Sequence, residues 1–138
     1  MSICFDYSCG SEKAMNGDIE FVSAVPVLAS LDIQRSVDFF AAKLGFTIRY
    51  ASQGVYGIVS RDSVNIHFWA CSDPSIPSAT GCRVGVRNIE SLYDHCAQQD
   101  IVHPNGLLNT TPWGNKEFAI IDADKNLVTF FEPVTLVA

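Results

Sequence analysis

The spacing of hydrophobic residues changes several times along this chain, and each change predicts an element. Residues 22–29 are apolar and rich in valine, which favours a buried strand. A helix is predicted next, between Asp32, which is suited to cap its N-terminus, and Gly45, which is suited to end it. The apolar face of this helix would consist of Ile33, Val37, Phe40 and Leu44.

Three short strands are predicted after the helix, at residues 46–51, 56–60 and 64–70. Residues 52–54 and 61–63 separate these strands, and both segments have the length and polar composition of hairpin turns. The first half of the chain therefore has the order strand, helix, then three strands.

The second half of the chain repeats that order. A strand is predicted at residues 81–86, and Asn88 is suited to cap the helix that follows. Asn88 lies 56 residues after Asp32, and the same offset places Ile89 on Ile33. The inner face of the second helix would hold Ile89, Leu92, Tyr93 and Cys96.

Three more strands complete the second half. They are predicted at residues 101–102, 117–121 and 126–132, with a turn at 122–125 between the last two. Residues 103–112 lack periodicity, so they are expected to form an irregular loop that is free to serve function.

Repetition of a whole supersecondary unit indicates a fold more strongly than any single propensity does. It predicts an α+β fold of two tandem βαβββ units, at about residues 22–71 and 79–133, which form a curved mixed sheet around a cleft. The two units make one domain at residues 21–138. Residues 1–20 are polar and lack sustained periodicity, so they are expected to be an N-terminal appendage.

Composition narrows the class of protein. The chain has 138 residues, of which 48% are hydrophobic and 17% charged, as is typical of one globular domain. Its apolar runs are far shorter than the roughly 20 residues of a membrane span. Acidic residues interrupt its first 12 positions, so a secretory signal is not expected.

The cysteines indicate the cellular location of the protein, and the net charge indicates the class of partner. Five scattered cysteines favour free thiols in a reducing compartment, so a cytoplasmic location is expected. The net charge is −6, and nine basic residues form no cluster, which argues against nucleic acid as a partner. An acidic protein favours cationic partners instead.

Two stretches of the sequence form recognisable motifs. The first combines residues 24–28, Asp32 and residues 37–46, which end in Leu-Gly-Phe. The second is Pro-Trp-Gly at residues 112–114 leading into Glu-Phe-Ala, followed by an Asp-x-Asp pair at 122–124. Together they resemble the glyoxalase/bleomycin resistance/dioxygenase superfamily, also called vicinal oxygen chelate. The second motif is most similar to its bleomycin resistance branch.

Enzymes of that superfamily hold a divalent metal, and the resemblance places the ligand positions at Val25, His67, Gly81 and Thr129. Only His67 is a good ligand, because valine and glycine side chains have no donor atom and a single threonine hydroxyl binds weakly. We therefore expect no metal, no cofactor and no metal-dependent chemistry. No Ser-His-Asp or Cys-His arrangement falls together in the repeat, so no catalytic residue is assigned.

Aromatic and polar residues are expected on the open face of the sheets. His67 and Trp69 share a face by strand alternation, and Arg83 shares a face with Gly81. Core packing is the alternative role for His67, Trp69 and Trp113. The residues predicted to bind a ligand are Tyr50, Tyr56, His67, Trp69, Arg83 and Trp113.

Bleomycin resistance proteins sequester their drug unaltered, stacking its planar part between aromatic side chains and attracting its cationic tail. The resemblance thus implies a metal-independent protein that confers antibiotic resistance by binding a planar, cationic drug of the bleomycin type. Trp113 falls on an aromatic position of the matching motif, whereas Arg83 replaces one. Arginine there would repel a cation or stack as a planar guanidinium.

Two alternatives stay open. One is a ligand carrier of different specificity on the same scaffold, because fold alone does not determine function. The other is an enzyme related to the glyoxalases and dioxygenases that uses His67 or another base on an unknown substrate.

Pro26 interrupts the first predicted strand, and proline is tolerated only at sheet edges or bulges. In the resembling proteins an N-terminal strand with this Val-Pro-Val pattern crosses to the partner subunit. The resemblance therefore implies a homodimer with exchanged N-terminal strands and two clefts at the subunit boundary.

Overall fold

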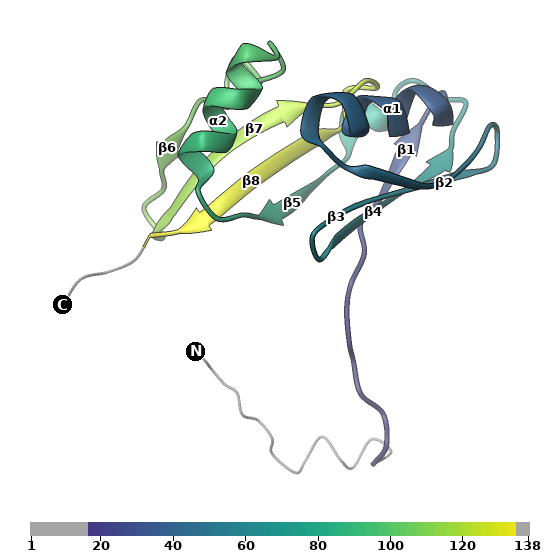
Figure 1. Cartoon of the computed structure of the whole chain (residues 1–138), viewed down its shortest axis with the longest axis horizontal. Coiled ribbons are helices and arrows are strands. Elements are labelled where there is room, and N and C mark those ends of the chain that lie inside the picture. Colours follow the sequence, from purple (N-terminus) through teal and green to yellow (C-terminus); the bar gives the residue numbers. More distant parts are fainter. Residues whose placement is uncertain (1–16, 135–138) are drawn as a thin grey trace.

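The repeat in the sequence is present in space as two four-stranded sheets, each with one helix (Figure 1). The computed structural model describes residues 17–134. The strand orders are β1-β4-β3-β2 and β5-β8-β7-β6, so both sheets have the same topology. In each, the outer pair β1–β4 or β5–β8 is parallel and the other pairs are antiparallel. The prediction of an α+β fold with two tandem βαβββ units is confirmed.

Apart from its first strand, the first unit closely follows the predicted boundaries. The Asp32 side chain accepts a hydrogen bond from the Arg35 amide at 3.1 Å, as an N-cap does. Gly45 ends the helix with a φ of 73°, a left-handed conformation that glycine adopts without strain. The elements are β1 (Val27–Ser30), α1 (Ile33–Leu44), β2 (Thr47–Ser52), β3 (Tyr56–Arg61) and β4 (Val64–Ala70).

The second unit starts its helix 56 residues after the first, as the sequence offset requires. A short 3₁₀ helix, η3 (Pro77–Ala79), precedes it. Its elements are β5 (Gly81–Gly85), α2 (Ile89–Gln98), β6 (Asn109–Thr110), β7 (Asn115–Ile121) and β8 (Leu127–Pro133).

The first strand is shorter than predicted. Residues 22–26 are not part of it, and β1 begins only at Val27, opposite His67. Pro26 explains the late start. Its carbonyl accepts a hydrogen bond from the His67 amide at 3.0 Å. Continuing the parallel ladder would require residue 26 to donate an amide proton to Asn65, and proline has none.

Three predictions in the second unit were wrong. Residues 101–102 do not form a strand, since only an isolated bridge joins Val102 to Ile120, and β6 lies within the segment expected to be irregular. Asn88 precedes α2, but it has a left-handed conformation and its side chain does not cap the helix. The Glu132 carboxylate caps it instead, accepting hydrogen bonds from the amides of Asn88 and Ile89 at 3.3 and 3.0 Å.

Both helices cover the same side of the molecule, and the opposite side of the sheets lies open in Figure 1. A core of buried side chains lies between helices and sheets, with Phe40 and Phe68 in the first unit and Phe118 and Phe130 in the second. Within residues 17–134 no helix is long and apolar enough to cross a membrane.

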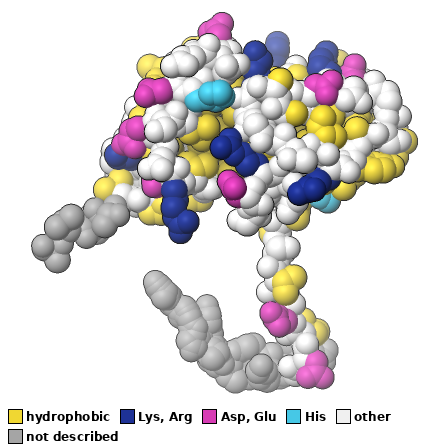
Figure 2. All heavy atoms as spheres, in the orientation of Figure 1, with side chains coloured by type: hydrophobic (Ala, Val, Ile, Leu, Met, Phe, Trp, Pro, Cys, Tyr) yellow, Lys and Arg dark blue, Asp and Glu magenta, His cyan; other side chains and the backbone are white. Residues whose placement is uncertain are grey.

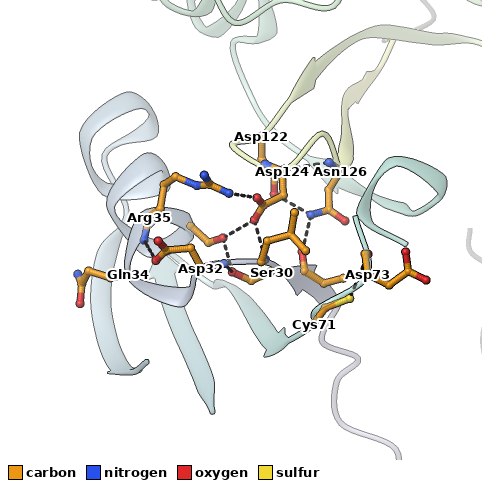
Figure 3. A network of polar contacts seen from close by, with 12 residues as sticks. Ser30, Asp32, Gln34, Arg35, Cys71, Asp73, Asp122, Asp124 and Asn126 are labelled. Atoms are coloured by element: carbon orange, nitrogen blue, oxygen red, sulfur yellow. Dashed lines mark hydrogen bonds and ion pairs between the residues drawn. The ribbon is translucent and has the colours of Figure 1, made fainter. Parts of the chain in front are cut away.

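A buried polar network joins the two units (Figure 3). Asp124, in the turn between β7 and β8, accepts hydrogen bonds from the Leu31 amide and the Ser36 hydroxyl, both at 3.1 Å, and forms an ion pair with Arg35. Asn126 donates to the Ala29 carbonyl at 2.8 Å. The turn of the second unit is thereby held against the end of β1 and the start of α1.

The N-terminal segment leaves the domain on its open side (Figure 1). Its described part runs from Gly17 to Pro26 and has no helix or strand. Hydrophobic and acidic side chains project from it (Figure 2), and Phe21 and Val22 are 86% and 81% exposed. Most of the predicted appendage, including Cys4 and Cys9, lies outside the described residues.

Candidate ligand-binding site

Four of the six predicted residues lie together on the open face of the first sheet. His67 on β4 is opposite Ile58 on β3, which is opposite Tyr50 on β2. Trp69 lies two positions along β4, opposite Tyr56. Because paired residues point to the same side of a sheet, these side chains share the face that α1 does not cover.

His67 and Tyr56 form a fixed pair on this face. A hydrogen bond of 2.8 Å joins the Tyr56 hydroxyl to Nδ1 of His67, and the two rings meet edge to face. Trp69 is 39% exposed and His67 is half-buried, so neither lies in the core. The face therefore presents aromatic surface to solvent, with a polar pair beside it.

Arg83 lies on the open face of the second sheet, opposite Thr129. Its guanidinium contacts the Glu117 carboxylate through both terminal nitrogens, at 2.6 and 3.4 Å. The guanidinium carbon also lies 4.9 Å from the centre of the Phe131 ring and over it. Arg83 is thus held by an acidic partner and an aromatic ring at once.

Arg83 and Glu117 each stabilise the charged form of the other. The hydrogen bond from Arg83 holds the pKa of Glu117 below its ordinary value, with a smaller contribution from Asn115. The same hydrogen bond raises the pKa of Arg83. Both groups are therefore charged across the physiological pH range.

Trp113 lies in the turn that joins β6 to β7 and is 71% exposed. The turn is well defined, because the Thr111 amide donates to the Asn115 carbonyl at 2.7 Å and the Asn115 amide donates to the Thr111 hydroxyl at 3.1 Å. Gly114 has a φ of 93°, which only glycine adopts readily. The turn presents the Trp113 indole to solvent rather than to the core.

The four positions at which the resemblance places metal ligands do not fit a metal, since Val25 and Gly81 lack donor atoms and Thr129 offers a single weak hydroxyl, which leaves His67 alone. The other histidines are engaged elsewhere. His95 donates from Nε2 to the Lys43 carbonyl at 2.7 Å, and His103 accepts from the Asn105 amide. Within residues 17–134, no three His, Cys, Asp or Glu side chains gather where they could share an ion.

Two of the described cysteines, Cys82 and Cys96, are poor nucleophiles. Burial raises the pKa of Cys82 to about 11, with a further contribution from Asp122, and burial raises the pKa of Cys96 to about 11. Such thiols stay protonated at neutral pH. Cys71 is buried beside β4, and its thiol donates to the Asp73 carbonyl.

The predicted site residues therefore form two groups. Tyr50, Tyr56, His67 and Trp69 belong to the first sheet, whereas Arg83 and Trp113 belong to the second unit. The sequence did not indicate Glu117 and Phe131 as partners of Arg83. Strand alternation places both on the open face, but their contacts with Arg83 depend on pairing between strands more than 30 positions apart.

The chain is similar to known proteins in sequence, although not to any family model. No family model matches the chain. The chain is 33% identical over 130 residues to the bleomycin resistance protein of Geobacillus stearothermophilus, covering 82% of this chain and 98% of that protein.

Two solved structures share the fold. The bleomycin-binding protein of Streptomyces verticillus, in complex with copper(II)-bleomycin, has a TM-score of 0.73 at 23% identity, covering 86% of this chain and 99% of that chain. The bleomycin resistance determinant encoded on transposon Tn5 has a TM-score of 0.70 at 22% identity, covering 82% and 98%.

Proposed function

This chain belongs to the bleomycin resistance protein family, within the glyoxalase/bleomycin resistance/dioxygenase superfamily, and we propose that it confers resistance by binding a planar, cationic drug of the bleomycin type. Binding without chemical change would keep the drug from its target. The observation that carries the proposal is the exposed aromatic surface of the open faces, to which Tyr50, Trp69 and Trp113 contribute.

The physical chemistry of these faces suits such a ligand. A flat π-system gains from stacking on exposed aromatic rings, and the indole of Trp113 is free to supply such a surface. A cationic tail is attracted by a protein of net charge −6. The chain's own residues offer no good metal set at the superfamily positions, which supports a binding role over metal-dependent catalysis.

Replacing Trp113 by alanine is expected to weaken bleomycin binding about tenfold, because the largest exposed stacking surface is removed. Isothermal titration calorimetry with metal-free and copper-loaded bleomycin measures the change, and chelator in a parallel titration tests metal independence. Quenching of tryptophan fluorescence in the unaltered protein gives a second measure.

Trp113→Phe is the matched control, since it retains a stacking ring at the same turn and should lose less than threefold. Equal losses in both variants would argue that the indole acts by some means other than stacking. Absence of bleomycin binding by the unaltered protein would reject the proposal and favour the alternative of a carrier with another ligand. Turnover of a substrate that survives chelator but not His67→Ala would favour an enzyme.

We further propose that two copies form a homodimer that exchanges N-terminal segments. The support is that residues 17–26 run away from their own domain with Phe21 and Val22 almost fully exposed, and exposed Val27 lies at the base of the segment. Isolated apolar side chains of this size gain about 1.5–3 kcal/mol each when fully buried. A partner would also bring its second sheet toward the first sheet of this chain, joining the two groups of site residues.

Deleting residues 1–22 is expected to shift the protein from dimer to monomer, because it removes the exposed side chains that the partner would bury. Sedimentation velocity at micromolar concentration measures the change. Deleting residues 1–16 is the control and should leave the dimer intact, since it retains Phe21 and Val22. A monomeric unaltered protein, or a dimer indifferent to the longer deletion, would contradict segment exchange.

A further inference from the structure

We infer that Arg83 is a specificity-determining residue of the drug site, where its guanidinium stacks on a planar part of the ligand. The inference rests on the proposed function and names the role of one residue in it. It also answers a difficulty raised by the sequence, namely that a positive charge in this position should repel a cationic drug.

The position of Arg83 allows such a role. It lies on the open face of the second sheet, and its side chain is 51% exposed. The guanidinium carbon lies over the Phe131 ring, 4.9 Å from its centre, and half of the side-chain surface is exposed, so a ligand can reach the group from the solvent side. Guanidinium groups stack well on π-systems because they are planar and weakly hydrated.

Glu117 neutralises the positive charge of Arg83, which would otherwise repel a cationic ligand. Its carboxylate is only 12% exposed and binds both terminal nitrogens of Arg83, which is the geometry that fixes the guanidinium plane. Asn115 donates a further hydrogen bond to the same carboxylate at 3.3 Å, so Glu117 is itself held in place. A ligand approaching Arg83 therefore meets a neutral ion pair with a flat surface, and not an isolated cation.

The Phe131 ring lies beneath the guanidinium of Arg83, and Gly85, which has no side chain, leaves space for the ring. A side-chain carbon added at Gly85 would lie 3.2 Å from the Phe131 ring, so the ring rests directly over the glycine. The order from the sheet outward is Gly85, Phe131, then Arg83. This stack limits the freedom of the arginine before any ligand arrives, which lowers the entropy cost of binding.

Three variants and one control separate the effect of the planar guanidinium of Arg83 from the effect of its charge. Arg83→Lys keeps the charge but loses the planar group, and its dissociation constant for bleomycin should rise about fivefold to tenfold. Arg83→Phe restores a flat surface without charge and should stay within about threefold of the unaltered protein. Glu117→Gln leaves the arginine charge uncompensated, and should weaken binding about tenfold, more at low salt than at high salt. Arg61→Lys, at the end of β3, is the control: its guanidinium donates to the Leu44 carbonyl at the end of α1, far from Arg83 in the sequence, and the variant should leave the dissociation constant for bleomycin unchanged.

Titrations use full-length protein with two probes, bleomycin and the planar cationic dye thioflavin T. The inference is overturned if Arg83→Lys binds as tightly as the unaltered protein, or if Arg83→Phe binds less tightly than Arg83→Lys. If bleomycin fails to bind but the dye follows the expected order, the stacking role of Arg83 stands for planar cations and the assignment of bleomycin falls. If bleomycin binds equally to all variants, the proposed function stands and the inference falls. If neither probe binds, both fall. Circular dichroism of each variant checks that the fold is retained.

Discussion

Replacing Phe40 by alanine is expected to lower the free energy of unfolding by about 3–5 kcal/mol, because it removes a ring from the centre of the core. Phe40 is fully buried on α1, and its ring meets those of Phe39, Phe46 and Phe68 edge to face at 5.4–5.7 Å. Alanine would leave a cavity where helix and sheet meet. Urea denaturation followed by circular dichroism measures the loss.

Phe39→Ala is the matched control, because Phe39 is the preceding residue on the same helix and is only partly buried. It should cost clearly less than Phe40→Ala. Equal losses would mean that α1 does not present Phe40 to the first sheet in the manner described, and would call for a different rotation of the helix about its axis.

Replacing Asp124 by alanine is expected to destabilise the protein by about 2–4 kcal/mol, although the residue lies in a turn. The Asp124 side chain is fully buried, and its loss would leave the Leu31 amide and the Ser36 hydroxyl without this acceptor. The Ser36 hydroxyl keeps a bond of 2.6 Å to the Ser30 hydroxyl, so the cost falls mainly on the Leu31 amide and on the cavity that the carboxylate leaves. The contribution of Arg35 itself is small, since its side chain is half exposed and screened by solvent.

Two further substitutions show whether the effect is that of a buried acceptor. Asp124→Asn keeps one oxygen for hydrogen bonding and should cost less than alanine. Asp62→Asn changes the corresponding turn of the first unit, where the side chain is exposed, and should stay within about 0.5 kcal/mol of the unaltered protein. If Asp124→Ala were equally neutral in chemical denaturation, the network in Figure 3 would not hold the units together.

The proposed drug site depends on these supports. The helices behind the two sheets position the open faces. The β7–β8 turn also does so, because Asp124 and Asn126 hold it against the first unit. Variants of Phe40 or Asp124 are therefore expected to lose drug binding only as far as they lose folded protein, whereas Trp113 and Arg83 variants should lose binding while remaining folded.

Much of the fold followed from the sequence alone. Both helices, the β4 boundaries and the ends of α1 depend on residues within a few positions of each other, so spacing and capping chemistry are sufficient to predict them, and comparison of the two halves of the chain then shows the repeat. Asp32 and Gly45 act as expected for this reason. Alternation along β4 also correctly placed His67 and Trp69 on one face.

Where a distant partner decides the outcome, the sequence was insufficient. Asn88 does not cap α2 because Glu132, 44 positions away, already satisfies the free amides. Residues 101–102 meet β7 at only one bridge, and Asn109 and Thr110 form the edge strand in their place.

The candidate ligand-binding site also has a part that the sequence predicted and a part that depends on distant contacts. The sequence determined the face of Trp69 by strand alternation and the place of Trp113 in a turn, because alternation and turn chemistry are short-range properties, whereas Tyr50 and Tyr56, expected beside loops, lie within β2 and β3. Only the tertiary structure decided what Arg83 does there, since its ion pair with Glu117 spans 34 positions and its aromatic floor at Phe131 spans 48. Strand register brings these three side chains together, and register is set by the packing of the whole sheet rather than by any one segment.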